Sequence, residues 1–490
     1  MRVERNEFLE AIQRRHQGMR QIPQPVIREM TMFLLKQFQF VNQAHPAIRS
    51  QECCHRESGK LGLSDPGHNS ESPRDYPETC PMHPRHAPCA LDSAPNPGYK
   101  MNDLARLAIL CLTAVSCSAG LPKGLDVVTT DSAGVTIVSA ESLDGLPVRS
   151  LGTPLVDLAF SQDSANASFS RVSAVLRLAD GRLVIADGAA RRLKLFGPDA
   201  TYLQTLTGPD GAPAEFSAIT AIWPAGSNGI AVLDQRKQRV TTLSLDGGQW
   251  QSSDLEAPGP SARPVGRLDG GAVLVRHLII DVPETGFELA HVAISRFGTD
   301  GELVDTVGIW PTARMGRLGE PPLQLVTGPM FEPRLTAAAA GERLVVSDCR
   351  LAEYRVIRPG EGLTHLVRWP AGDLRVSEDD VLSYRATRLD GLSPEQQQQR
   401  RRLLDAMPVN AILPACDQLR IDIEGRVWIR SFVRPAAVQQ EWLVFDPAGR
   451  PLFSVEFPVA TRIMDLGARH VTVIETDSLN VPRIRVYEFK

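Results

Sequence analysis

The feature that most constrains the fold is a unit of consecutive strands that recurs along the last three quarters of the chain. Its clearest copies are LADGRLVIADGAARRLKLFGPDATYLQTL at 178–206, SNGIAVLDQRKQRVTTLSLDGG at 227–248 and AGERLVVSDCRLAEYRVIRPGEG at 340–362. A weaker copy combines IEGRVWIRSF at 423–432 with EWLVFDPAGRPLFSVEF at 441–457. Short apolar strands alternate with polar or DG-type turns, and repeats of about 40–50 residues built in this way are typical of β-propellers.

Six such units can be placed along the chain, and the last one, which starts near Thr461, lacks an outer strand. Residues 125–138 (LDVVTTDSAGVTIV) contain two strand-like runs around a turn. Because an unpaired edge strand is a liability, we expect this N-terminal segment to close the ring. The sequence therefore predicts an all-β fold, a six-bladed β-propeller over 125–490.

Residues 376–408 interrupt the strand pattern between the fourth and fifth units. Ser377, followed by three acidic residues, marks a helix start, and Ser393 with Pro394 and Gln396 marks a second one. We expect a small helical insertion here. It would either cover a face or the central channel of the propeller, or decorate the surface.

Residues 101–120 have the layout of a secretory signal peptide. The apolar run from Leu107 to Val115 is about nine residues long, whereas a spanning helix needs about 20. The end of the run, AVSC at 114–117, resembles the lipoprotein cleavage box of bacteria, although Ala114 stands where Leu is usual. The resemblance implies a signal peptide over 101–117 and lipidation of Cys117; ordinary secretion and a buried apolar segment are the alternatives.

A signal peptide has to be N-terminal, so we expect residues 1–100 to be a disordered or mis-annotated extension. Cys80, His83, His86 and Cys89 within it are residue types that hold zinc. However, four ligands within ten residues, interrupted by prolines, leave little chain to wrap a metal ion. We therefore predict no metal site there.

The repeated units resemble NHL-type repeats, and 125–490 is similar to the six-bladed propellers of bacterial exported lipoproteins. The residues that carry the resemblance are DGRLVIADGAARRLKLF, GAPAEF at 211–216, IEGRVWIR and EWLVFDPAGR. The resemblance implies a lipid-anchored protein of the bacterial cell envelope, in the periplasm or at the outer membrane, with a partner-binding face of loops. It does not identify the ligand, because propellers host unrelated activities.

The second strand of each unit ends in a charged residue that belongs to the candidate ligand face. Asp187 and Asp234 each precede an arginine by five residues, so each carboxylate could cap a turn and pair with the arginine opposite. Such pairs either tie turns together or bind a ligand. The complete set of candidate residues is Asp187, Arg192, Asp234, Arg239, Arg276, Asp348, Arg430 and Glu475.

Cys349 and Cys416 are the two cysteines that lie within the predicted propeller, 67 positions apart in adjacent units. In an exported protein such a pair could form a disulfide, and two separate buried thiols are the alternative.

A net charge of −4 argues against nucleic-acid binding, which requires clustered basic residues. We therefore expect a binding scaffold without a cofactor, for an unknown protein, peptide or glycan. The alternative is a calcium-dependent lactonase or esterase, since acidic side chains at a propeller axis can hold calcium. Arg276 and Arg430 would disfavour a cation there. A purely structural envelope component is a third possibility that the sequence does not distinguish from the first.

Overall fold

The computed structural model describes residues 125–160, 168–207, 216–246, 250–256, 261–320, 324–477 and 481–489. All of these belong to the compact unit Ala119–Lys490. The predicted signal peptide, Cys117, the cluster at 80–89 and most of the GAPAEF segment lie outside the described residues. No helix in the described ranges is long and apolar enough to span a membrane.

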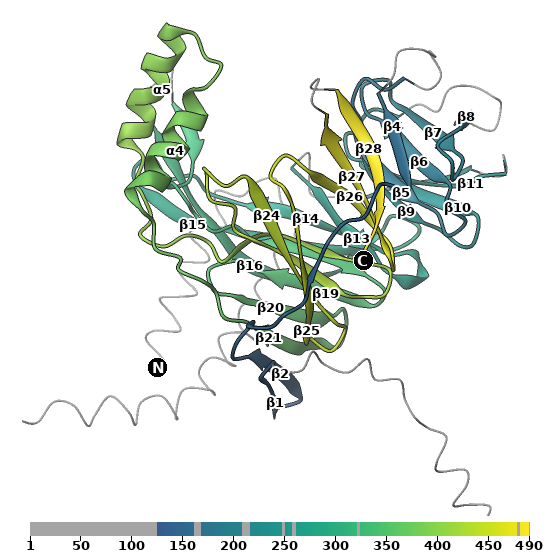
Figure 1. Ribbon diagram of the computed structural model, residues 1–490, viewed down its shortest axis with the longest axis horizontal. Coiled ribbons are helices and arrows are strands. Elements are labelled where there is room, and N and C mark those ends of the chain that lie inside the picture. The colour runs from purple at the N-terminus through teal and green to yellow at the C-terminus, as the bar shows by residue number, and fades with distance from the viewer. Residues whose placement is uncertain are drawn as a thin grey trace, which may run out of the picture. The chain divides into compact units, whose positions relative to one another are not determined.

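The described strands form a six-bladed β-propeller, and each of the first three blades consists of four consecutive antiparallel strands (Figure 1). Their bounds in chain order are β5 (Val172–Arg177), β6 (Leu183–Asp187), β7 (Arg192–Phe196), β8 (Tyr202–Leu206), β9 (Ile219–Pro224), β10 (Gly229–Asp234), β11 (Arg239–Ser244), β12 (Trp250–Asp254), β13 (Arg263–Arg267), β14 (Val273–Ile279), β15 (Phe287–Phe297) and β16 (Leu303–Leu318), with β17 (Leu325–Thr327) added to the last edge.

The remaining blades repeat the arrangement, except that the sixth borrows one strand from the N-terminal part of the propeller. Their bounds are β18 (Thr336–Ala340), β19 (Arg343–Ser347), β20 (Glu353–Arg358), β21 (Gly362–Arg368), β22 (Cys416–Ile421), β23 (Val427–Ser431), β24 (Gln439–Phe445), β25 (Pro451–Pro458), β26 (Arg462–Leu466), β27 (His470–Thr476) and β28 (Pro482–Glu488).

The ring is closed by β4 (Val156–Ala159), which pairs antiparallel with β28. The expectation that 125–138 would close blade six was therefore wrong. Those residues form most of the hairpin β1 (Val127–Ser132) and β2 (Val135–Ala140), and β2 pairs in parallel with β21 of blade four. The physical reason is burial, because Val138 packs into the apolar cluster shared by blades four and five. A short strand β3 (Val148–Arg149) then pairs with β25 on the way to β4.

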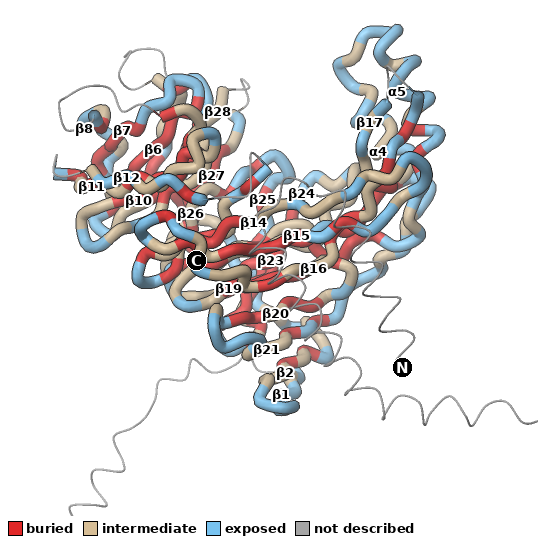
Figure 2. Tube along the Cα trace, turned by 180° about the vertical axis from the view of Figure 1, so that it is seen from behind, coloured by how far each residue is buried: buried red, intermediate tan, exposed pale blue. Residues whose placement is uncertain are grey.

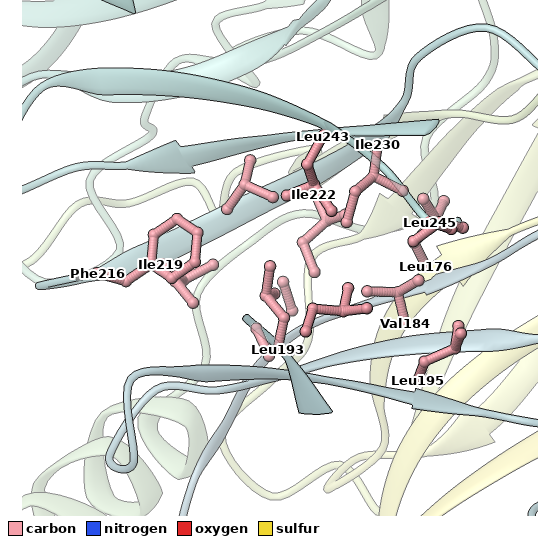
Figure 3. Close-up of a cluster of buried hydrophobic side chains, with 14 residues drawn as sticks. Leu176, Val184, Leu193, Leu195, Phe216, Ile219, Ile222, Ile230, Leu243 and Leu245 are labelled. Carbon is pink, nitrogen blue, oxygen red and sulfur yellow. The ribbon is translucent and has the colours of Figure 1, made fainter. Parts of the chain in front are cut away.

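The apolar core consists of separate layers between neighbouring blades. Figure 3 shows the layer between blades one and two, where Leu176, Val184 and Leu193 meet Ile222 and Leu243. Both faces of a blade are covered in this way, so the middle strand LVIAD is buried throughout. Figure 2 shows buried residues concentrated in such strands.

The inner strands of the blades are β5, β9, β13, β18, β22 and β26, and they run in the same direction around the channel. The parallel bridge between Gly266 and Ala339 demonstrates this direction for blades three and four. We call the mouth where the inner strands begin the start face, and the mouth where they end the turn face. The second strand of each blade ends at the start face, because it runs antiparallel to the inner strand.

The predicted helical insertion is confirmed as α4 (Glu378–Leu389) and α5 (Pro394–Ala406). Ser377 and Ser393 each form a capping box, with Asp380 and with Gln396. The hairpin packs against the long β15–β16 extension of blade three, through a cluster that includes Phe331 and Leu404 (Figure 1). In the described part of the chain, no residue of either helix lines the channel, so the insertion stands beside the channel.

Candidate functional site

The inner strands surround a channel with a cavity volume of about 1140 Å³. Each of the six blades contributes its inner strand to the wall, and blade five adds Arg430, Gln440 and Trp442. A cavity of this size, lined by every repeat, is the default candidate for a binding site in such a fold.

The start face is rich in exposed arginines. Arg171 directly precedes β5, Arg263 begins β13, Arg334 lies two residues before β18, and Arg462 begins β26. Because the inner strands are parallel, these four exposed side chains from different blades gather around one mouth of the channel.

The turn face carries acidic side chains together with arginines. Asp180, Asp269, Glu342 and Glu424 are exposed in the turns that follow the inner strands of blades one, three, four and five. Blade six differs, since Arg469 is exposed in its turn. Asp180 is paired with Arg182 at 2.6 Å and Glu424 with Arg426 at 2.8 Å. Arg267 and Arg343 also line this end of the channel, so the turn face is mixed in charge.

Arg430 projects into the channel near the start face and is held by two side chains. Its Nε donates to Asp417 Oδ1 at 2.6 Å, and a terminal nitrogen donates to Gln440 Oε1 at 2.9 Å. Gln440 is 1% exposed and donates to the carbonyl oxygen of Thr461 at 2.6 Å. Burial raises the pKa of Asp417, and the hydrogen bond from Arg430 only partly opposes this effect. The guanidinium is thus fixed in position by a rigid polar network.

A second charged pair, Arg420 on β22 and Asp465 on β26, lies deeper in the channel wall. Asp465 Oδ2 accepts a hydrogen bond from the backbone N–H of Arg177 on β5 at 3.0 Å. Burial raises the pKa of Asp465 to about 6, although the backbone amides of Arg177 and Leu466 and the charge of Arg420 lower it. Burial likewise lowers the pKa of Arg420, while Asp465 raises it. Within the described residues, Arg420 Nε is buried without a hydrogen-bond partner.

Asp187 and Asp234 stand opposite Arg192 and Arg239 in the strand register. The carboxylate of Asp187 accepts hydrogen bonds from backbone N–H groups on both sides of its hairpin, at Ser170, Arg171, Ala189 and Ala190. Asp234 accepts from the backbone of Ser217, Ala218 and Lys237. Arg239 pairs with Asp254 at 2.6 Å. Both aspartates therefore act as ties between loops.

The other candidates are also engaged by neighbouring groups. Arg276 donates to the carbonyl oxygen of Leu335 at 3.1 Å, and Asp348 accepts from the backbone N–H of Arg350 at 3.0 Å. Glu475 accepts from Arg485 at 2.9 Å and from the Tyr487 hydroxyl at 2.8 Å. Of the eight candidates, Arg430 is the one that lines the channel in the described structure.

Sequence reasoning missed Arg420, Asp465 and the start-face arginines. A signal was present, because Arg420 and Asp465 are charged residues near the ends of inner strands, next to the apolar residues Ile421 and Leu466. The start-face arginines could have been found by asking which residue precedes each inner strand. Both signals depend on knowing which strand of a repeat is innermost.

The structure joins the sulfur atoms of Cys349 and Cys416 in a disulfide, with 4.9 Å between the two Cα atoms. The bond connects the turn after β19 in blade four to the first residue of β22 in blade five. Cys349 precedes the helical insertion in the chain and Cys416 follows it, so the insertion lies within the loop that the disulfide closes.

No group of three or more His, Cys, Asp or Glu side chains in the described ranges is arranged to hold a metal ion. The acidic residues that line the channel, Asp269, Asp422, Glu424 and Asp465, come from three different blades. The carboxylate of Asp422 is bound by Arg426 at 2.6 Å and by the indole N–H of Trp428 at 2.9 Å.

No protein-family model and no curated protein matches the chain. Among solved structures, it is similar to a protein of Bacteroides fragilis described as exported, at 12% identity over 72% of this chain and 100% of that chain, with a TM-score of 0.39. It is also similar to virginiamycin B lyase of Staphylococcus aureus (10% identity, 68% of this chain, 98% of that chain, TM-score 0.32). A third similar structure is a gluconolactonase of Xanthomonas campestris, at 13% identity over 66% of this chain and 87% of that chain, with a TM-score of 0.31. Likenesses this distant carry no inference about activity or ligand.

Proposed function

We propose that the protein is an exported, lipid-anchored binding scaffold that takes an acidic segment of a protein, peptide or glycan at the start face. The observation that carries the proposal is the group of exposed arginines from four blades that gathers at the start face. At the turn face, by contrast, Asp180 and Glu424 are paired with Arg182 and Arg426. An anionic ligand is therefore attracted to the start face.

The residue type supports this choice of ligand. An arginine guanidinium presents planar donors that match carboxylate and sulfate geometry, and it remains charged at every physiological pH. Asp187 and Asp234, which end second strands at this face, are bound to backbone amides. The β15–β16 extension and the helical hairpin also rise beside this mouth and could supply further contacts.

Export is supported by the disulfide between Cys349 and Cys416, since disulfides persist in oxidising compartments. The lipid anchor on Cys117 rests on the resemblance of AVSC to a cleavage box. The intact mass of the protein recovered from membranes tests it. A mass that begins at Cys117 with added acyl groups is expected, and one that retains Met1 would contradict the anchor.

The rival function is a calcium-dependent lactonase or esterase. The observation in its favour is that Asp422 and Asp465 both line the channel. Against it, Arg420 interacts with Asp465 and Arg426 is bound to Asp422, so each carboxylate already faces a positive charge. Stoichiometric calcium binding by calorimetry, together with lactone hydrolysis that chelator abolishes, would establish the rival.

The binding proposal is tested with a fluorescein-labelled oligoglutamate peptide, followed by anisotropy at low salt. The variant Arg171→Ser/Arg334→Ser removes two exposed start-face charges and is expected to weaken binding about tenfold, at about 0.7 kcal/mol for each exposed contact. The control Arg469→Ser removes one exposed charge from the turn face and should bind as the wild type does; the single variant Arg171→Ser, which also removes one charge, should bind about threefold more weakly than the wild type. Equal losses in Arg171→Ser and Arg469→Ser, or no binding by the wild type, would overturn the proposal.

A further inference from the structure

The pair Arg420 and Asp465 has an unusual feature, which is that two half-buried opposite charges lie on the channel wall without a direct ion pair. Among the described residues, the ion pairs within 4.0 Å do not include one between these two side chains. Their charges nevertheless influence each other, because each one favours the charged form of the other. The buried guanidinium nitrogen Nε of Arg420 is left without an acceptor. A buried donor of this kind is costly unless a ligand or water satisfies it.

The surroundings of the pair are strongly basic. Arg177 on β5 faces Asp465 from blade one, and its own Nε is also buried without a partner in the described structure. Arg430 on β23 and Arg462 on β26 both act on Arg420 through their charges. His470 on β27 is a further titratable neighbour, and its pKa is lowered by burial and then by the charge of Arg177, while Glu488 raises it. The arginines that act on the Asp465 carboxylate are thus Arg420 and Arg177, and Arg430 is itself paired with Asp417 at 2.6 Å.

We propose that Arg420 and Asp465 form an anion site inside the channel, which binds one oxyanion of the carboxylate or sulfate type together with one proton that Asp465 takes up. This inference rests on the proposed function, because it assigns the place where an acidic group of the same ligand enters the channel. An anion in the channel compensates the positive charge of the Arg420 guanidinium, which belongs to the channel wall. It also repels the Asp465 carboxylate, and protonation of that carboxylate removes the repulsion.

The surroundings of Asp465 allow its carboxylate to take up a proton within the physiological pH range. Its carboxylate is already held by the backbone amides of Arg177 and Leu466, so it stays in place whether charged or neutral. Burial raises its pKa to about 6 even without an anion, and an added negative charge raises it further. Binding at pH 7.5 should therefore draw one proton from solution, and affinity should fall as pH rises.

The experiment is calorimetric titration of the full-length protein with sodium sulfate at pH 5.5, 6.5 and 7.5, at constant ionic strength. Sulfate keeps its charge over this range, so any pH dependence belongs to the protein. Buffers with different ionisation enthalpies count the protons. The expected result is a Kd that increases up to about tenfold per pH unit above about 6, with uptake of about one proton at pH 7.5.

Three variants assign the effect to residues. Asp465→Asn should bind sulfate at pH 7.5 about as tightly as the wild type does at pH 5.5, with no proton uptake. Arg420→Met should lose binding at every pH, and Arg420→Lys, which retains the charge, should recover part of it. His470→Asn is the matched control and should keep the wild-type pH dependence.

Several results would overturn the inference. The inference fails if the sulfate affinity of Asp465→Asn still depends on pH, or if that of His470→Asn no longer does. It also fails if folded Arg420→Met binds sulfate as tightly as the wild type. Absence of sulfate binding to the wild type would also overturn it. If oligoglutamate still binds in that case, and Arg171→Ser/Arg334→Ser still weakens it, the proposed function stands and only the inner site fails.

Discussion

Gly266 in β13 and Ala339 in β18 form a parallel bridge, so the inner strands of blades three and four touch inside the channel. A Cβ atom on residue 266 would overlap with the carbonyl oxygen of Ala339. The glycine is therefore required by the close approach of two backbones.

Gly266→Ala should force the two strands apart and destabilise the propeller by about 1–3 kcal/mol, the usual range for overpacking. Urea denaturation followed by tryptophan fluorescence measures the change. Gly372→Ala is the control, because a Cβ there meets nothing within 4 Å. If the two variants have the same urea midpoint, the result would contradict the close contact between the inner strands of blades three and four.

Asp465→Asn should stabilise the protein at neutral pH. In the folded state the pKa rises from 3.8 to about 6, so the native protein binds more protons than the unfolded chain between these values. Stability therefore falls as pH rises through this window, by at most about 3 kcal/mol for a shift of about two units. Denaturation midpoints at pH 4.5 and 7.5 should differ less in Asp465→Asn than in the wild type. An identical pH dependence in both proteins would contradict the burial of this carboxylate.

Glu332 connects blade three to the root of the helical insertion. Its carboxylate, 1% exposed, accepts hydrogen bonds from Arg314 at 2.7 Å and from Asn410 at 2.9 Å. Burial alone would raise the pKa of Glu332, but the hydrogen bonds from Arg314 and Asn410 lower it. The group's contribution to stability is thus present above the unfolded-state pKa of 4.5 and is lost as pH falls below it.

Glu332→Gln should cost about 2 kcal/mol and loosen the insertion, since it leaves part of the arginine network unpaired. Limited proteolysis should cut within 376–408 faster than in the wild type. Glu361→Gln, at a side chain that is 63% exposed, serves as the control and should leave the cleavage rate unchanged. If Glu332→Gln is cleaved no faster than the wild type, the helical hairpin does not depend on this carboxylate.

The bond between Cys349 and Cys416 closes a loop that contains the whole insertion, with a sequence separation of 67. For a loop of this length, the chain-entropy model gives a stabilisation of about 4 kcal/mol. A reducing agent should therefore lower the urea midpoint of the wild type. The double variant Cys349→Ala/Cys416→Ser should already be destabilised and insensitive to reductant. Free thiols are counted in denaturant before and after reduction. If reduction does not increase the number of free thiols in the wild type, the disulfide is absent.

Local chemistry predicted local structure well. Asp187 and Arg192 stand in register, and Ser377 and Ser393 cap helices, because neighbours in sequence determine each of these features. The strand that closes the ring could not be found in this way. Val156–Ala159 is four residues long, and its partner β28 lies more than 300 positions away, as in the ion pair of Asp157 with Arg483.

The candidate site was harder to predict for the same reason. Arg420 and Asp465 meet only because two blades are neighbours in space, and burial then gives their charges an importance that the sequence does not reveal. The start-face arginines can be recognised as one group only when it is known that the inner strands all run in the same direction.

The central claim, that an acidic ligand binds at the start face, is tested most directly by photo-crosslinking. A benzophenone amino acid replaces either Arg462, the first residue of β26 at the start face, or Arg469, in the turn that follows β26 at the turn face; both residues are exposed. With labelled oligoglutamate at low salt, the probe at position 462 should form an adduct that added salt suppresses, and the probe at 469 should not. Adducts at 469 alone, or equally at both positions, would contradict the account.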